Sequence, residues 1–150
     1  DSRVFSVKKE MPSFLKAVIV IPNVHMSTNQ SRGSLPKKYT KEEAIFNLSR
    51  SSLLAALLFG GNYDMLRVAS KDKFHQDIRM KTLPELFEVQ RLALENGALM
   101  STLSGSGSSF FNMTYADDAQ RIKKVLEGAF SFFRVEIMDF DNDGLVCNKN

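Results

Sequence analysis

Four segments of the chain have the residue pattern of β-strands. Each is short and rich in Val, Ile, Phe, Tyr or Thr, the residue types that favour strands. Residues 15–22 are apolar almost throughout, as expected of a strand in the middle of a sheet. The predicted strands cover residues 15–22, 99–103, 109–115 and 133–139. A weaker alternation over residues 3–8 predicts a short strand ahead of them.

Three longer segments have helical start and stop signals. The clearest begins with a T-x-x-E capping box at Thr40 and ends at Gly60 and Gly61. The second begins at Pro84, which suits a first helical turn, and the third at Asp117, which is placed to cap it. The predicted helices cover residues 41–59, 84–96 and 117–131.

The order of these elements predicts the fold class. Strand, helices, strand, strand, helix and strand make the βαββαβ pattern of ferredoxin-like α+β domains, with an extra helical insertion between the first two strands. Right-handed crossovers then place the helices on one face of an antiparallel sheet. We therefore expect one such domain, with all three predicted helices covering one face.

A loop of small residues, SGSGSS at 104–109, joins the second and third strands. Gly105 and Gly107 can adopt positive φ and leave no side chain over the backbone. Successive N–H groups in such a loop can form a concave site for an anion. The same composition is typical of a flexible hairpin turn, which is the commoner case for a lone G-x-G. The loop alone leaves both readings open.

Charge is unevenly spread along the chain. Residues 1–50 carry nine Lys and Arg against four Asp and Glu, whereas residues 101–150 carry five against seven. A basic first third suits an anionic partner such as a phosphate or a carboxylate. Adjacent basic residues occur only in pairs, which is too sparse for a nucleic-acid footprint. We therefore expect no nucleic-acid partner.

Cysteine content and hydropathy indicate a cytoplasmic protein. The single cysteine, Cys147, excludes an intrachain disulfide, which fits a reducing compartment. No apolar run approaches the roughly 20 residues that span a bilayer, and the chain does not open with a signal peptide. We expect no membrane partner. Because the chain begins with Asp1, we expect it to be processed or to be a piece of something longer.

Two arginines and a histidine are candidate ligand-binding residues. Arg32 follows the first core strand and Arg79 ends the irregular HQDIR segment, so both can reach the Gly/Ser loop in a βαββαβ fold. A guanidinium group can hold a carboxylate through two parallel hydrogen bonds, although a single arginine is more often an ordinary surface residue. His75 can act as a base or orient a ligand, but is more often structural. Nothing marks a serine as a nucleophile, and we assign no catalytic residue.

Two further patterns have plainer explanations. The DFDNDG segment at 139–144 starts like a calcium loop, but the twelfth position is Asn150 rather than Glu. An Asp-Gly turn is predicted there, and no metal site is assigned. Phe110, Phe111 and Tyr115 lack the basic-Gly-aromatic order of an RNA-stacking strand, so we expect them to pack in the core.

Four segments, taken in order, resemble the homoserine kinases of the GHMP small-molecule kinase superfamily. They are VIVIPNVHMSTNQSR at 18–32, AIFNLSR at 44–50, KDKFHQDIR at 71–79 and LSGSGSSFF at 103–111. The third segment follows the family's D-R-x-H-Q-x-x-R pattern, except that Lys73 replaces the first Arg. The fourth resembles the superfamily's third motif, a glycine-rich loop, with Ser108 where the family often has Pro. The resemblance covers most of residues 15–140.

The resemblance implies the C-terminal domain of such a kinase over residues 15–150. Residues 1–14 would be a lead-in strand from an absent N-terminal domain. The family's P-x-x-x-G-L-x-S-S-A phosphate motif and its magnesium-binding acidic residue belong to that domain and do not occur here. ATP and Mg²⁺ would then be bound mainly by the absent half, which is an implied partner, and the fragment alone would be inactive.

The resemblance also implies a reaction and a set of site residues. The γ-phosphoryl group of ATP would be transferred to the side-chain hydroxyl of L-homoserine, giving O-phospho-L-homoserine in threonine biosynthesis. Thr28, Arg32 and Arg79 would bind the α-carboxylate and orient the hydroxyl, and His75 would sit behind the substrate. Gly105 would let the backbone approach the substrate. Support for the phosphate loop would come from Ser104, Gly105, Ser106 and Gly107.

Two alternatives remain open. One is another GHMP kinase, such as a mevalonate-pathway enzyme, although the H-Q-x-x-R segment favours the homoserine kinases. The other is a non-catalytic, ferredoxin-like module that binds an amino acid as a regulator; a compact module of that kind would lack the helical insertion over residues 40–96. A homodimer is also left open.

Overall fold

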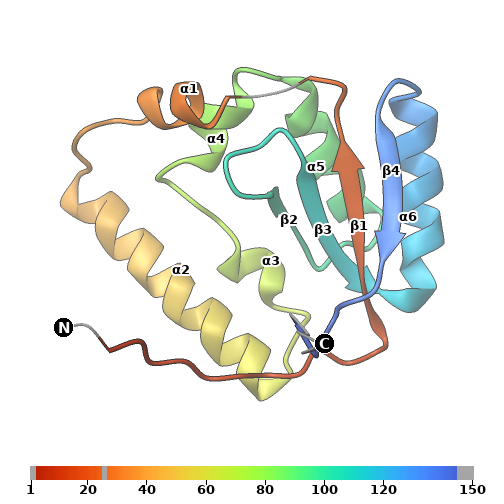
Figure 1. Ribbon diagram of the computed structural model, residues 1–150, viewed down its shortest axis with the longest axis horizontal. Helices are drawn as coiled ribbons and strands as arrows, with labels where there is room; N and C mark the ends of the chain where they lie inside the picture. Colours follow the sequence, from red (N-terminus) through yellow and green to blue (C-terminus); the bar gives the residue numbers. More distant parts are fainter. Residues whose placement is uncertain (1–2, 25–26, 145–150) are drawn as a thin grey trace, which may run out of the picture.

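The computed structural model describes residues 3–24 and 27–144, and a four-stranded sheet lies at its centre (Figure 1). The strands are β1 (Leu15–Ile21), β2 (Met100–Leu103), β3 (Phe110–Tyr115) and β4 (Arg134–Met138). They lie in the order β2-β3-β1-β4, and every neighbouring pair is antiparallel. This order is that of the ferredoxin-like pattern, so the predicted α+β fold is confirmed.

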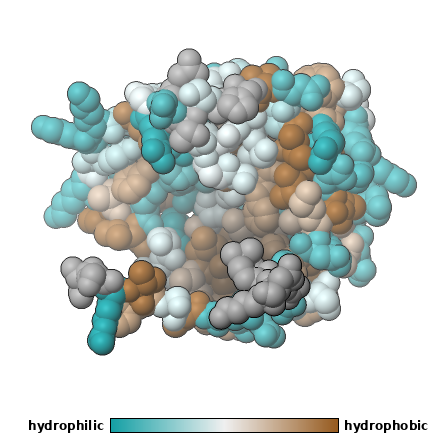
Figure 2. Space-filling model, in the orientation of Figure 1, coloured by the Kyte–Doolittle hydropathy of each residue, from teal (hydrophilic) through white to brown (hydrophobic). Residues whose placement is uncertain are grey.

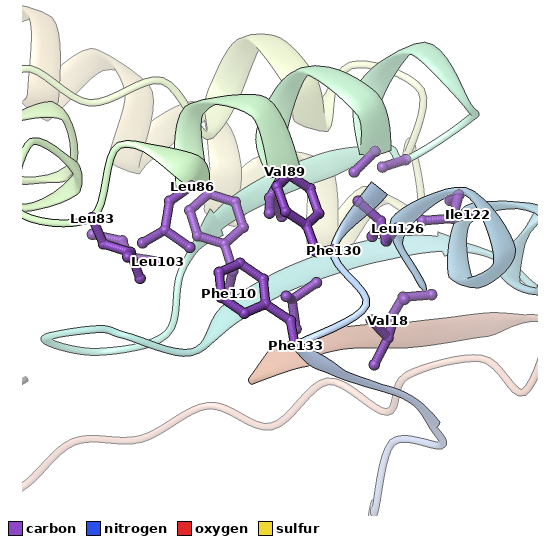
Figure 3. Packing of buried hydrophobic residues seen from close by; sticks show 14 of the residues in the cluster. Val18, Leu83, Leu86, Val89, Leu103, Phe110, Ile122, Leu126, Phe130 and Phe133 are labelled. Atoms are coloured by element: carbon purple, nitrogen blue, oxygen red, sulfur yellow. The ribbon is translucent and has the colours of Figure 1, made fainter. Parts of the chain in front are cut away.

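Two helices, α5 (Glu85–Glu95) and α6 (Ala116–Ala129), close one face of the sheet. Their apolar stripes pack against strand side chains that point toward them, among them Val18 and Phe110 (Figure 3). Both of these side chains are fully buried. The two helices were predicted to within about two residues, because amphipathic stripes and stop signals are local features of the sequence.

The start of α6 differs in detail from the prediction. Tyr115 is the N-cap residue and its side chain makes no capping hydrogen bond, so the predicted cap at Asp117 is wrong. Asp117 lies instead in the first turn of α6, where a carboxylate interacts favourably with the positive end of the helix dipole.

The first part of the helical insertion, before α5, packs on the other side of the sheet. Helix α2 (Lys41–Gly60) leads into α3 (Leu66–Ala69), and both contribute to a second apolar cluster with Met113. Met113 lies three positions after Phe110 in β3, so it points to the opposite face. The expectation that helix 41–59 covers the same face as the other two is therefore wrong, because the alternation of β3 gives the sheet two apolar sides.

Helix α2 has the predicted ends. The Thr40 hydroxyl accepts the N–H of Glu43 at 3.1 Å, and the Glu43 carboxylate accepts the N–H of Thr40 at 2.8 Å. Gly61, the C-cap residue of α2, adopts a φ of 71°, a left-handed conformation that glycine tolerates best. The capping box read from the sequence is confirmed.

Two short helices lie at the end of the sheet that carries the Gly/Ser loop (Figure 1). Helix α1 (Thr28–Gly33) follows β1, and α4 (Gln76–Met80) falls in the segment that has no clear periodicity in the sequence. Five residues are too few for an apolar stripe to repeat, which is why the pattern did not predict α4.

Outside the domain core, residues 3–8 form no strand, and Val4, Phe5 and Val7 are exposed. The assignment of residues 1–14 to the lead-in of a preceding domain stays a prediction. At the other end, Asp141 accepts the N–H groups of Asp143 and Gly144 at 2.8 and 3.2 Å, which forms the predicted turn. Within the described residues, no helix is both long and apolar enough to cross a membrane.

Candidate functional site

The Gly/Ser loop over 104–109 is a tight turn held by its own backbone. The N–H of Ser104 donates to the carbonyl oxygen of Ser109 at 2.9 Å, and the N–H of Gly107 donates to that of Ser104 at 3.1 Å. Gly105 and Gly107 adopt φ of 60° and 89°, which requires glycine at both positions. Because two N–H groups are used inside the loop, Ser104 and Gly107 support its shape rather than offer those donors to an anion.

Segments that follow β1 hold the loop from one side. Ser31 of α1 is buried, and its hydroxyl donates to the carbonyl oxygen of Ser106 at 2.9 Å. The Ser108 hydroxyl donates to the carbonyl oxygen of Val24 at 2.5 Å. A shallow depression of about 400 Å³ lies between residues 21–24 and residues 107–109. The loop and the segment after β1 therefore form one surface.

Arg79 contacts the loop from α4. It lies in the last turn of α4, and its Nη1 donates to the carbonyl oxygen of Gly105 at 3.3 Å. Its Nε is buried and has no hydrogen-bond partner among the described residues. Buried guanidinium nitrogens are normally paired, so this donor still lacks an acceptor.

A buried carboxylate, Asp72, orients the start of α4. It accepts the backbone N–H groups of His75 at 2.6 Å and Gln76 at 2.7 Å, and the side-chain amide of Asn47 from α2 at 2.7 Å. Burial alone would raise the pKa of this carboxyl, but the hydrogen bonds outweigh it and hold the pKa below its usual value. Asp72 is therefore a charged anchor between α2 and α4.

His75 stands beside this anchor. Its Nδ1 lies 3.7 Å from the Asp72 carboxylate, which is beyond hydrogen-bond range, and is a buried atom without a partner among the described residues. The ring as a whole is partly open, with 41% of the side chain exposed. The carboxylate fixes the backbone of His75, while the imidazole itself stays available for a further hydrogen bond.

Gln76 fastens α4 to the edge of the sheet just ahead of the loop. Its side-chain oxygen accepts the N–H of Leu103, the last residue of β2, at 3.1 Å, and its amide donates to the carbonyl oxygen of Ser70 at 3.2 Å. Gln76 is buried. The helix that carries Arg79 is thus attached at its first residue to the strand that enters the loop.

The remaining candidates lie on α1. Arg32 is exposed in the last turn of that helix, and its guanidinium makes no ion pair or hydrogen bond within the part of the chain that the structure describes. Thr28 is the first residue of α1, but its side chain lies outside the described part of the structure. The structure therefore brings Arg79 and Gly105 into contact and brings α1, but not the Arg32 side chain, to the loop.

Sequence reasoning missed the residues that hold the site together. Asp72 and Asn47 lie in two of the recognised segments, yet no role was assigned to them, and Ser31 was not singled out. The Asn47–Asp72 and Ser31–Ser106 hydrogen bonds join residues 25 and 75 positions apart along the chain, and contacts across such distances leave no periodic signal. A local hint was Asp72 itself, a short acidic side chain ahead of α4 of the type that accepts backbone N–H groups at helix starts.

A second cavity borders the first turn of α4. Its volume is about 390 Å³, and none of the five predicted substrate residues lines it. It is bordered by Phe46, Arg67, Ser70, Lys71, Asp72, Lys73, Gln76, Asp77, Gln90, Leu94 and Ser101. Over the residues described, no three carboxylate, imidazole or thiol groups gather in a way that could hold a metal ion.

Comparison with known proteins identifies the family of this chain. Residues 49–131 match the family described as GHMP kinases C terminal. A homoserine kinase from Nitratiruptor is 58% identical over 149 residues, and one from Helicobacter pylori strain J99 is 57% identical over 148. These matches cover 99% of this chain but 51% and 50% of the relatives, so the chain spans about half of their length.

Solved structures agree with the sequence comparison. The crystal structure of homoserine kinase from Cytophaga hutchinsonii superposes with a TM-score of 0.80 at 27% identity, covering 88% of this chain and 43% of that one. A putative homoserine kinase from Listeria monocytogenes shares the fold, with a TM-score of 0.72 at 17% identity, covering 94% of this chain and 46% of that one. The chain belongs to the GHMP kinase family and corresponds to its C-terminal domain.

Proposed function

We propose that this chain is the C-terminal domain of an ATP-dependent homoserine kinase and forms the wall of the site that binds the amino acid. The observation that carries the proposal is the contact between Arg79 and the Gly105 carbonyl, made by two segments that resemble homoserine kinase motifs. Relatives that carry this name match nearly the whole chain at 53–58% identity, which supports the same assignment.

In this proposal, Arg79 binds the α-carboxylate of homoserine. Its buried Nε needs a hydrogen-bond acceptor, and a carboxylate is the acceptor that fits the planar donor geometry of a guanidinium group. Arg32 and Thr28 lie on α1, which reaches the loop through Ser31. From there they would hold the same carboxylate and the side-chain hydroxyl of the substrate.

His75 and the loop would complete the substrate wall. The unpartnered Nδ1 of His75 lies one turn of α4 before Arg79 and would face the substrate from behind. Gly105, with its open surroundings, would let the substrate approach the backbone. Ser104, Ser106 and Gly107 would fix the loop against the phosphate-binding half.

Phosphoryl transfer depends mainly on the positioning of the reactants and on charge stabilisation. This chain would position the amino acid. ATP and Mg²⁺ would be held mainly by the preceding N-terminal half. When bound, ATP would supply the phosphoryl group, and Mg²⁺ would supply positive charge that stabilises the transferring phosphoryl group. The homoserine hydroxyl would be aligned with the γ-phosphorus by Arg79, Arg32 and Thr28. We assign no residue of this chain as the base. The reaction would serve threonine biosynthesis in the cytoplasm.

The experiment uses the full-length parent protein and a panel of acceptors. Homoserine should be phosphorylated, whereas 3-aminopropan-1-ol, which lacks only the carboxylate, should lose roughly 100-fold or more in kcat/KM because the buried guanidinium is left unpaired. Mevalonate should not react. Equal use of the two amino alcohols, or a preference for mevalonate, would overturn the assignment.

The isolated chain provides a second check. Purified residues 1–150 should show no ATP turnover with homoserine, because the phosphate-binding motif is absent. Turnover above background, after contaminating kinases are excluded, would contradict the proposal that the N-terminal half is needed to bind ATP.

A further inference from the structure

The outer side of α2 has an apolar stripe that nothing in the described chain covers. Ile45, Leu48 and Phe59 are exposed by 55%, 68% and 47%. Together with Ser52 and Ala56, which are also exposed, they follow a spacing of three and four residues, so they lie along one face of the helix. The stripe therefore runs for four turns of α2, opposite the side that packs against α3.

Charged residues are missing from this stripe. From residue 44 to residue 62 the only charged side chain is Arg50, and it lies over the ring of Phe46 rather than on the stripe. A solvent-facing side of a helix normally carries charged residues, whereas a helix that is apolar all round is normally buried. The Nε of Arg50 is a buried atom with no hydrogen-bond partner among the described residues. The lack of charge indicates that the stripe is a contact surface rather than a solvent-facing side of α2.

The first residues of the chain show a second uncovered surface close to α2. Val4, Phe5 and Val7 are exposed by 93%, 82% and 81%. The segment of residues 3–10, here called the arm, runs in Figure 1 past the C-terminal end of α2. Met11, which follows the arm, packs in the same apolar cluster as Leu54 of α2. Figure 2 shows apolar atoms near the end of the arm and around the hollow in the middle of this side of the molecule.

We propose that the α2 stripe and the arm together form the docking surface for the polypeptide that precedes residue 1 in the full-length protein. The relatives are about twice as long as this chain, and the part matched here is their C-terminal domain. A preceding domain is connected through the arm, whose base lies against α2. This inference concerns the contact surface and does not depend on the substrate.

A second copy of the chain fits the surface less well. The stripe is about 21 Å long and about 10 Å wide, so two stripes would bury roughly 400 Å² in total. Stable interfaces between separate proteins bury about 1,200 Å² or more. A domain tethered through the arm needs much less area, because the linker gives it an effective concentration in the millimolar range.

The test is photo-crosslinking in the full-length protein. Benzoylphenylalanine is placed at position 48 and, as the matched control, at position 87, where Phe87 is a partly exposed apolar residue on α5, away from α2. A mixture of ¹⁴N- and ¹⁵N-labelled protein separates contacts within one chain from contacts between copies. Position 48 should crosslink to peptides that precede residue 1 of the same chain, and position 87 should not.

Two results would overturn the proposal. Crosslinks from position 48 that join labelled to unlabelled chains would assign the stripe to a second copy. Crosslinks no more frequent than those from position 87 would show that the stripe faces solvent. As an independent readout, Leu48→Glu should lower the Tm of the full-length protein by several degrees more than Phe87→Glu; equal shifts would also contradict the proposal.

Discussion

The two faces of the sheet are covered in different ways. On one face, α5 and α6 bury Phe110 and Val18 completely. On the other, α2 and α3 cover only part of the sheet, so that Phe111 stays partly exposed. The closed face is made by helices next to the strands in the chain, whereas the other face depends on an insertion that is itself apolar on two sides.

The chain closes one face of the sheet by itself and leaves the other partly open. The closed face is built from β1 and residues 80–137 alone. The partly covered face carries the exposed stripe of α2 and lies beside the exposed arm, and these are the surfaces for which we propose a further domain. Stability should therefore depend mostly on the first face, and contacts with the rest of the protein mostly on the second.

The largest loss of stability is expected at Phe110, on the closed face of the sheet. Phe110→Ala should destabilise the chain by roughly 3–5 kcal/mol, because it opens a cavity in a fully buried cluster. Phe111→Ala, the adjacent residue on the other face, should cost less than half as much. Urea unfolding of both variants measures the difference, and equal losses would mean that the two faces are equally well packed.

A smaller loss of stability is expected at Asp72, the anchor between α2 and the start of α4. Asp72→Asn should cost about 1–3 kcal/mol at pH 7, because two backbone N–H groups and the Asn47 amide lose their charged acceptor. Asp77→Asn, which changes an exposed carboxylate in the first turn of α4, is the matched control and should have little effect. A loss of the same size in both variants would remove the special role of Asp72.

The pH dependence of the same anchor has a defined sign. The pKa of Asp72 is lowered in the folded chain from an ordinary value of 3.8, so its contribution is present above that value. It is lost as the pH falls through the lower folded pKa. Unfolding curves of the wild type and Asp72→Asn should differ at pH 7 and converge progressively as the pH falls below 3.8. A difference that persists at low pH would show that the carboxylate charge is not the cause.

The smallest effect lies at the start of the insertion. Thr40→Ala removes one half of the capping box of α2 and should cost about 1 kcal/mol. Thr40→Ser, which keeps the hydroxyl acceptor, should restore most of the loss. If both variants unfold at the same urea concentration, the cap does not contribute to the stability of α2.

Much of the fold could be predicted because its signals are local. The apolar run of β1, the capping box at Thr40 and the stripes of α5 and α6 all lie within a few residues of the elements they define. The position of α2 could not be predicted in this way, since a helix that is apolar on both sides does not indicate which side faces the sheet.

The candidate site was predictable in part for the same reason. Arg79 and the loop at Gly105 were expected at one edge of the sheet from the order of the elements, and the structure brings them into contact. The anchor from Asn47 through Asp72 to the start of α4 was not expected. It is made of single polar contacts between distant segments, and these become visible only when the chain is folded.

The proposed contact between Arg79 and the carboxylate of homoserine can be measured by steady-state kinetics of Arg79→Lys in the full-length protein. Lysine keeps the charge but loses the paired donors, so kcat/KM for homoserine should fall tenfold or more, corresponding to roughly 1.5–3 kcal/mol. The KM for ATP should stay unchanged. Arg91→Lys, a surface arginine paired with Glu88 and Glu95, is the control and should leave both values as they are. If Arg79→Lys leaves homoserine kinetics unchanged, or raises only the KM for ATP, Arg79 does not bind the carboxylate of homoserine.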